Sequence, residues 1–299
     1  MAKSFLLGTD WWTDCDDVMA VRILARAHRE GRAKLLGCIL NACMEHSVVS
    51  LDAFLKSESV PGVPIGLDPE ATDFGGNPPY QKRLAVLPSD RTGNEDAEHP
   101  VGLYRRILAE AAEPVDLIEI GYPQVLAALL QSGPDRFSPL DGVSLVRRKA
   151  GELWIMAGKW DEPDGGRENN FARNRRASEA AALLCRLWPG RITFLGWEVG
   201  ATVVAGGFLP ESDVLKQAMI DHGSGGGRSS WDPMLILLAL AGSPEAAGYG
   251  SVRGRASADP QTGANFFEKQ PEGPHRFVVK RHPDEFYAEQ VNGALRPQS

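Results

Sequence analysis

Residues 5–20 read FLLGTDWWTDCDDVMA, and this stretch decides the fold. It opens with an apolar run, Phe5–Leu7, that has the length of a short buried strand. A polar loop, Gly8–Asp17, follows. Apolar residues then recur at helical spacing over 18–27, which predicts an amphipathic helix. A strand that leads through a polar loop into a helix is the repeating unit of an α/β fold.

The same alternation continues along the chain. We expect further strands over 34–40, within 60–67, and over 115–120, 143–146, 153–156 and 192–195. We expect helices over 48–55, 101–112, 177–187, 214–220 and 233–240, with a further helix starting at 125–130. Strand-like segments at 250–258, 264–267 and 277–280 precede a C-terminal helix over 283–294.

This pattern predicts an α/β fold with an open, mostly parallel sheet flanked by helices, a Rossmann-like core. Residues 68–98 are rich in Pro, Gly, Asp and Asn, and they predict a long surface loop. Because neither a linker nor a repeat divides the chain, we expect a single domain over 1–299.

The composition argues against a nucleic-acid binder and a membrane protein. The 299 residues carry 32 Lys+Arg and 39 Asp+Glu, a net charge of −7, whereas phosphate neutralisation needs a basic face. No run approaches the roughly 20 apolar residues of a membrane span. Phe5–Leu7 is too short for the core of a signal peptide, so we expect a cytosolic protein.

The cysteines give no sign of a metal or redox motif. The four of them, Cys15, Cys38, Cys43 and Cys185, form no CxxC pair. In a reducing compartment, we expect them to be small buried hydrophobic side chains.

Four carboxylates gather in the first loop. Asp10, Asp14, Asp16 and Asp17 follow the first strand, and ligands of open α/β sheets bind at the carboxyl ends of strands. Clustered anions repel one another unless a cation compensates them, and calcium and magnesium favour carboxylate oxygens. Negative charge in the first helical turn would explain Asp16 and Asp17 but not Asp10. The loop therefore favours a metal or sugar site.

Other polar groups lie at the ends of later strands. They are Asn41, the carbonyl of Ile120, the pair Glu168 and Asn170, and Asp232. Each has an ordinary alternative explanation: a turn residue, a solvated loop, or a helix cap before proline. Their placement at successive strand ends of one sheet favours a shared site.

The ordered motifs resemble those of the inosine-uridine preferring nucleoside hydrolases. The loop at 8–20 looks like the family's N-terminal aspartate motif, in the longer variant with two extra residues before the final Asp-Asp pair. Asn41 matches the Asn that ends the family's second strand. The segment at 168–171, ahead of Glu-Ala-Ala at 179–181, resembles the family's Glu-x-Asn segment, and Trp-Asp-Pro at 231–233 resembles its His-Asp-Pro. The resemblance extends from residue 5 to about 240.

This resemblance implies calcium-dependent hydrolysis of the N-glycosidic bond of a nucleoside or related riboside, in purine or pyrimidine salvage. It implies a Ca²⁺ ion bound by Asp10, Asp17, Asp232 and the carbonyl of Ile120, with Asp10 as the general base. It implies substrate contacts from Asp16, Asn41, Glu168, Asn170 and Trp231. It also implies a nucleoside-hydrolase-like fold and a homodimer or homotetramer, with neither nucleic acid nor membrane as a partner.

Two of the departures from the family pattern bear directly on the chemistry of this site. Gly8 stands where the family usually has an Asp, which removes support from the metal loop. Trp231 stands where the family has a His that assists departure of the base, and an indole N–H does not titrate usefully. His222, in a Gly-rich stretch, is a candidate substitute acid, and Asp14 is a further candidate site residue.

Two functions of different classes follow. The first is an N-ribohydrolase. The alternative is a non-catalytic or regulatory ribose- or nucleoside-binding protein that keeps the metal loop but has lost turnover. A magnesium-dependent phosphatase would need a downstream Lys and a Ser or Thr in register, which we do not find in the sequence. Release of reducing sugar from nucleosides, with and without a chelator, separates the first two.

Overall fold

The computed structural model describes residues 2–12, 14–74 and 79–296. Thr13 of the aspartate loop and residues 75–78 of the long predicted loop therefore lie outside the described residues. The strands are β1 (Lys3–Thr9), β2 (Ala33–Leu40), β3 (Ile65–Leu67), β4 (Val115–Glu119), β5 (Ala150–Met156), β6 (Ile192–Leu195), β7 (Val204–Ala205), β8 (Arg228–Ser229), β9 (Tyr249–Ala258), β10 (Asn265–Lys269) and β11 (His275–Lys280).

Helices connect most of these strands. They are α1 (Asp16–Arg29), α2 (Ser47–Ser57), α3 (Gln81–Leu84), α4 (Pro100–Glu110), α5 (Gln124–Gln131), α6 (Gly142–Lys149), α7 (Asn169–Ala172), α8 (Arg175–Leu187), α9 (Trp197–Gly200), α10 (Val214–Asp221), α11 (Trp231–Ala241) and α12 (Asp284–Leu295), with a short 3₁₀ helix at Asn94–Asp96. Within the described residues, no helix is long and apolar enough to cross a membrane.

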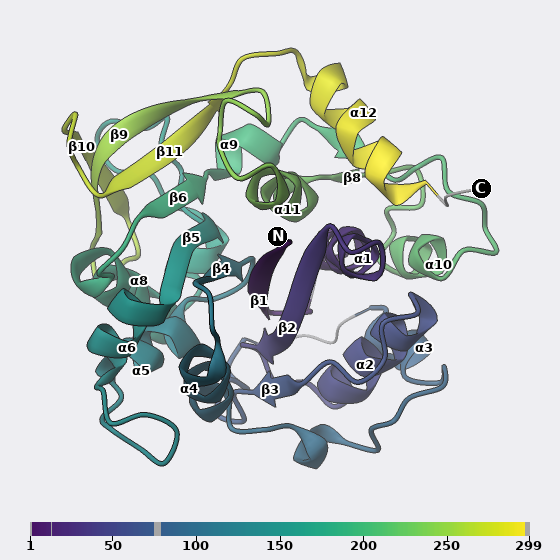
Figure 1. Cartoon of the computed structure of the whole chain (residues 1–299). Helices are drawn as coiled ribbons and strands as arrows, with labels where there is room; N and C mark the ends of the chain where they lie inside the picture. Colours follow the sequence, from purple (N-terminus) through teal and green to yellow (C-terminus); the bar gives the residue numbers. More distant parts are fainter. Residues whose placement is uncertain (1, 13, 75–78, 297–299) are drawn as a thin grey trace.

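The central sheet is open and mostly parallel, as the sequence predicts. Over the described residues it has nine strands in the order β10-β9-β11-β6-β5-β4-β1-β2-β3. Each neighbouring pair from β11 to β3 is parallel, whereas β9 is antiparallel to both β10 and β11. The C-terminal segments thus extend the parallel sheet at one edge (Figure 1).

The strand order reverses at β1. The chain runs outward from β1 through β2 to β3, and then returns to β4 on the opposite side of β1. The crevice outside the carboxyl ends of strands at such a switch point is where open α/β sheets bind ligands. The residues that follow β1 and β4, Asp10 and Ile120, lie at this point.

Helices cover both faces of the sheet (Figure 1). One apolar cluster packs α1, α2, α11 and α12 against one face. A second packs α4, α5, α6 and α8 against the other face. The two clusters make β1 and β4 buried central strands, so the polar residues that follow them have a rigid base.

Most predicted elements agree with the structure, but the strand predicted over 143–146 is wrong. These residues belong to α6, whose N-cap Asp141 accepts a 2.8 Å hydrogen bond from the backbone N–H of Ser144. Three basic residues occupy the last turn of α6, where positive charge is favourable. A short apolar run does not by itself distinguish a buried strand from a helix, and here the cap decides.

The cysteines are free, and three of them are buried, as the sequence predicts. Cys43 is only partly buried.

Candidate active site

A cavity of about 290 Å³ lies at the switch point of the sheet. Its walls come from the loop after β1, the first turns of α1 and α11, the ends of β4 and β5, and the segments that carry α7 and α9. The lining residues are Asp10, Asp14, Asp16, Asp17, Ile120, Met156, Glu168, Asn169, Asn170, Trp197, Arg228, Trp231 and Asp232. Segments more than 200 residues apart in the sequence thus meet in one cavity.

The loop after β1 is tightly held. Trp11 adopts a left-handed backbone conformation, φ 48°, which is uncommon for a residue other than glycine. Its backbone N–H donates to Oγ1 of Thr9 at 3.0 Å, and its indole N–H donates to Oγ of Ser50 at 2.9 Å. The Trp11 carbonyl accepts from the side chain of Gln81 at 2.6 Å. These contacts turn the loop so that Asp10 faces the cavity.

Three carboxylates form the densest part of the site. Asp16, Asp17 and Asp232 each offer an oxygen within 4.8 Å of the others' oxygens. Packing of α1 against α11 brings them together, and the backbone N–H of Asp232 donates to Oδ2 of Asp16 at 3.2 Å. Asp232 is the second residue of α11, whose N-cap is Ser230, so Asp232 is not the cap of this helix.

Burial and mutual repulsion dominate the electrostatics of these groups. Burial raises the pKa values of Asp16, Asp17 and Asp232 well above the usual range, and neighbouring aspartates raise them further. Burial also raises the pKa of Asp10 to about 8, opposed by a hydrogen bond from the backbone of Trp12. Such carboxyls ionise together only if a positive charge lies among them.

Glu168 and Asn170 also line the cavity. Both Glu168 oxygens accept backbone N–H groups at the start of α7, from Asn170 at 2.6 Å and from Phe171 at 2.8 Å. The Asn170 amide donates to the Met156 carbonyl at 2.9 Å and lies 3.4 Å from the Ile120 carbonyl. Burial raises the pKa of Glu168 to about 7. Both side chains therefore have fixed orientations at the cavity.

Asn41 lies behind the cavity rather than in its lining. Its side chain is fully buried. Its amide N–H donates to Oε1 of Glu119 at 2.7 Å, and its amide oxygen accepts from the backbone N–H of Tyr122 at 2.9 Å. Both polar atoms are thus engaged with the end of β4, so a direct contact of Asn41 with ribose stays a prediction.

Two tryptophans and one arginine form the mouth of the cavity. The rings of Trp197 and Trp231 lie 6.3 Å apart, and the indole N–H of Trp231 donates to the Trp197 carbonyl at 2.7 Å. The guanidinium of Arg228 lies 5.3 Å from the Trp231 ring centre. It forms a two-pronged ion pair with Asp14, in which Nε donates to Oδ1 at 2.8 Å. Among the described lining residues, Arg228 is the one basic side chain.

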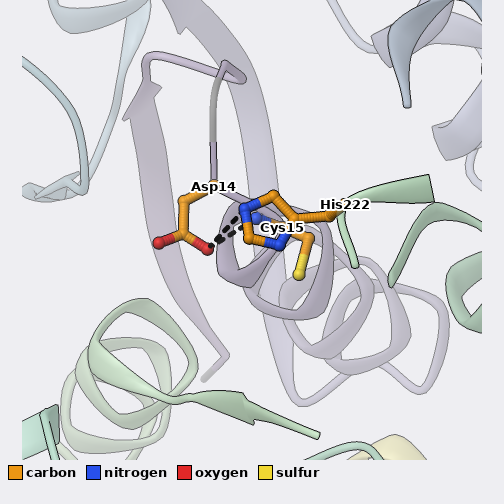
Figure 2. A group of neighbouring side chains, drawn as sticks. All are labelled: Asp14, Cys15 and His222. Atoms are coloured by element: carbon orange, nitrogen blue, oxygen red, sulfur yellow. Dashed lines mark hydrogen bonds and ion pairs between the residues drawn. The ribbon is translucent and has the colours of Figure 1, made fainter. Parts of the chain in front are cut away.

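His222 lies beside this mouth but does not line the cavity. Figure 2 shows its imidazole close to Asp14 and Cys15 at the start of α1. Its Nε2 is 3.8 Å from Oδ1 of Asp14, and its Nδ1 is 2.9 Å from the hydroxyl of Ser224. Because Arg228 already pairs with Asp14, this group is poorly suited to bind a further cation.

Sequence reasoning missed Arg228, Trp197 and Glu119. Arg228 pairs with a residue 214 positions away, and Trp197 belongs to a short helix with no motif around it. Glu119 ends the buried strand β4, which also contains Asp116, and its place in the sequence gives no indication of its neighbours. The one available signal was the position of Glu119 directly before Ile120, at a strand end already singled out.

The donor chemistry of the cavity fits a hard cation. Asp10, Asp17 and Asp232 offer carboxylate oxygens, and Ile120, which has a backbone carbonyl to offer, belongs to the same lining. All of these are oxygen donors, as Ca²⁺ requires. Burial, and then repulsion from neighbouring aspartates, raise the pKa values of these carboxyls, and a cation among them would offset both effects. The structure therefore contains an acidic site that could hold a metal ion.

No protein-family model and no curated protein sequence matches the chain. Solved structures do match it. The plant nucleoside hydrolase PpNRh1 is 14% identical, with 99% of both chains covered and a TM-score of 0.73. The inosine-uridine preferring nucleoside hydrolase from Bacillus anthracis is 14% identical, covering 98% of this chain and 99% of that one, at a TM-score of 0.66.

The type III effector protein XopQ, solved in complex with adenosine diphosphate ribose, is also similar. It is 16% identical, covering 99% of this chain and 94% of that one, at a TM-score of 0.66. The chain thus has the fold of the nucleoside hydrolases over nearly its whole length, as its motifs predict.

Proposed function

We propose that this protein is a calcium-dependent N-ribohydrolase that cleaves a nucleoside or a related riboside into ribose and base. One observation carries the proposal. In a chain with the nucleoside hydrolase fold, carboxylates from the β1 loop, α1 and α11 line one cavity together with Glu168 and Asn170. This combination offers oxygen ligands for a metal on one wall and hydrogen-bonding groups for a sugar on the other.

Asp10, Asp17, Asp232 and the Ile120 carbonyl would hold the ion. A bound Ca²⁺ would orient a water molecule, lower its pKa and hold sugar hydroxyls. Asp10 is fixed by the backbone N–H of Trp12, which donates to Oδ1 at 3.1 Å. Oδ2 of Asp10 takes the proton of the attacking water.

Asp16, Glu168 and Asn170 hold the ribose. Each carboxylate oxygen has two lone pairs, so Glu168 can accept hydroxyl hydrogens while it caps α7. Cleavage of an N-glycosidic bond passes through an oxocarbenium-like state, which nearby carboxylates stabilise. The acidic lining of the cavity thus suits the charge that develops on the sugar.

The departing base faces the aromatic mouth. Trp231 lies where a planar base can stack, and no histidine is among the described residues of the lining. His222 would have to leave Ser224 to reach the cavity. The protein therefore relies on stacking against Trp231 and on the good leaving ability of its substrate, rather than on an imidazolium.

The alternative is a protein that binds a riboside without turnover. XopQ shares the fold and was solved with adenosine diphosphate ribose, and the Trp231–Arg228 mouth lacks an obvious proton donor. These two observations favour a binding role. Tight riboside binding with no sugar release over hours would establish the alternative.

The experiment is a sugar-release assay on purine and pyrimidine nucleosides, run after chelation and again after calcium is restored. We expect release that falls to background with chelator and returns with Ca²⁺ but not with a monovalent salt. Isothermal titration with the same nucleosides separates turnover from binding.

Light scattering of the purified protein tests the homodimer or homotetramer that the resemblance implies. A role in nucleobase salvage stays a proposal of the same resemblance, and localisation in the cytosol stays a proposal from the sequence.

A further inference from the structure

A fully buried carboxyl at the end of β4 lies next to the site but belongs to none of its motifs. Glu119 is 0% exposed and pairs in register with Gly8 of β1. It directly precedes Ile120, a residue of the cavity lining. A carboxyl in a central strand is costly to bury unless it is hydrogen-bonded or paired.

The carboxyl of Glu119 occupies the space beside Gly8. A Cβ atom at position 8 would lie 2.1 Å from Oε2 and 2.7 Å from Oε1 of Glu119. Gly8 has an ordinary negative φ, so the backbone does not require glycine there. The Glu119 carboxyl therefore fits between the strands only because residue 8 has no side chain.

This carboxyl joins the ends of β2 and β4. Its Oε1 accepts from the amide of Asn41 at 2.7 Å and from the backbone N–H of Gly121 at 3.0 Å. These two bonds fix the Asn41 side chain and the turn that contains Ile120. Oε2 has no hydrogen-bond partner among the described residues, at a cost of about 1–3 kcal/mol.

We propose that Glu119 is a positioning residue of the site. From β4 it supplies, in the space left by Gly8, the carboxyl that holds the Asn41 side chain behind the cavity and fixes the turn that follows Ile120, a residue of the cavity lining. This proposal rests on the proposed function, because it assigns Glu119 a role in the same calcium and ribose site. It also explains why the chain tolerates glycine at position 8.

The test exchanges the carboxyl between the two strands. Glu119→Met keeps the volume but removes the acceptor, whereas Glu119→Gln keeps an acceptor oxygen. Gly8→Asp alone places a side chain against Glu119, and Gly8→Asp with Glu119→Ala moves the carboxyl to β1. Asp116→Asn is the matched control, because Asp116 is a buried carboxyl of the same strand that bonds to Trp154, away from the cavity.

The readouts are Ca²⁺ affinity, measured by displacement of luminescent Tb³⁺, and the unfolding temperature. We expect Glu119→Met to weaken Ca²⁺ binding at least tenfold, Glu119→Gln to retain most of it, and Asp116→Asn to leave it unchanged. We expect Gly8→Asp to destabilise the protein more in the presence of Glu119 than in the Glu119→Ala background. Where turnover is measurable, KM for a riboside should rise more than kcat falls.

Wild-type Ca²⁺ affinity in folded Glu119→Met, or additive effects of the position 8 and position 119 changes on stability, would overturn the proposal. Failure of the wild type to bind Ca²⁺ would overturn it too, because a positioning role needs a site. Intact Ca²⁺ binding without sugar release would contradict only the proposed hydrolysis and leave the role of Glu119 standing.

Discussion

At the scale of single residues, charge compensation governs this site. Asp16, Asp17 and Asp232 are each less than 5% exposed, and Arg228, the basic side chain among the described lining residues, is paired with Asp14. Buried carboxylates without a partner are expensive. Their retention in one cavity indicates a ligand that supplies positive charge, and the oxygen-only donor set favours a hard cation.

Asp10→Asn should abolish hydrolysis and leave the fold intact. An amide cannot take a proton from the attacking water, and it is a weaker ligand for a cation, so we expect the rate to fall at least about 10²-fold. Circular dichroism and the sugar-release assay measure the two effects. Asp52→Asn, a buried residue bonded to Ser89 and far from the cavity, is the matched control. Undiminished activity of Asp10→Asn would remove this residue from the mechanism.

Activated ribosides should be cleaved far better than ordinary nucleosides. Trp231 cannot protonate a leaving base, and a general acid is typically worth about 10²–10⁴ in rate. Steady-state rates on p-nitrophenyl riboside, inosine and uridine test this expectation. Comparable rates on all three would reveal a proton donor. Loss of nucleoside cleavage alone in His222→Ala would identify His222 as that donor, whereas the structure leads us to expect no effect.

At the scale of elements, strands and helices are predicted well where the hydrophobic period of a segment and its length indicate the same kind of element. The run over 192–195 is β6 residue for residue, and the apolar period of 18–27 lies within α1. The run over 143–146 fails because four apolar-rich residues fit either state, and the Asp141 cap acts from outside the run. Local patterns also leave the order of strands undetermined, because pairing of β1 with both β2 and β4 depends on long-range packing.

The candidate site likewise contains residues that the sequence predicts and residues that only the structure reveals. Asp10 and Ile120 could be predicted to meet, because strand ends of a parallel sheet share one edge. The prediction that Asp232 also follows a strand of this sheet is wrong, because Asp232 comes after β8, which pairs with β7 outside the central sheet, and packing of α11 on α1 brings it to the site. Arg228 could not be predicted, because its ion pair with Asp14 depends on how β8 lies against the first loop. The orientation of Asn41 also needed the structure, since Glu119 and Tyr122 determine which way its amide points.

The β9–β11 pair contains an acid-sensitive residue. His275 is 1% exposed, and its Nδ1 accepts the backbone N–H of Ala256 at 2.9 Å. Burial, and secondarily the charge of Arg255, lower its pKa from 6.5 to about 4. The unfolded chain therefore binds the proton first as pH falls. This contribution to stability is complete above pH 6.5 and is lost as the pH falls toward about 4.

Denaturant unfolding at pH 7 and pH 4.5 measures the effect. Asn can present an acceptor near the position of Nδ1 but does not titrate, so His275→Asn should lose less stability on acidification than the wild type, by up to about 3 kcal/mol. Equal losses in the two proteins would show that His275 is not the group that responds.

At the scale of the whole molecule, the site brings together an early segment and a late segment of the chain. Asp10 and Asp17 come from the first segments of the chain, and Asp232 comes from α11, which packs directly on α1. A cation that binds all three links segments more than 200 residues apart. Such a ligand binds the folded chain only, because the unfolded chain does not hold these carboxylates together.

Calcium should therefore raise the unfolding temperature of the whole protein. A ligand at about 100 times its Kd contributes about 2.7 kcal/mol to the free energy of unfolding, which for a chain of this size is a shift of about 5 °C. Differential scanning calorimetry with Ca²⁺, with Mg²⁺ and with chelator measures the shift. Asp232→Asn should abolish the calcium shift, whereas Asp116→Asn should lower the starting temperature and keep the shift.

A wild-type unfolding temperature that is the same with calcium and with chelator would contradict a metal site at this cavity. A shift without sugar release would favour the binding protein over the hydrolase, because stabilisation needs only the ligands and turnover also needs a leaving group that departs unaided.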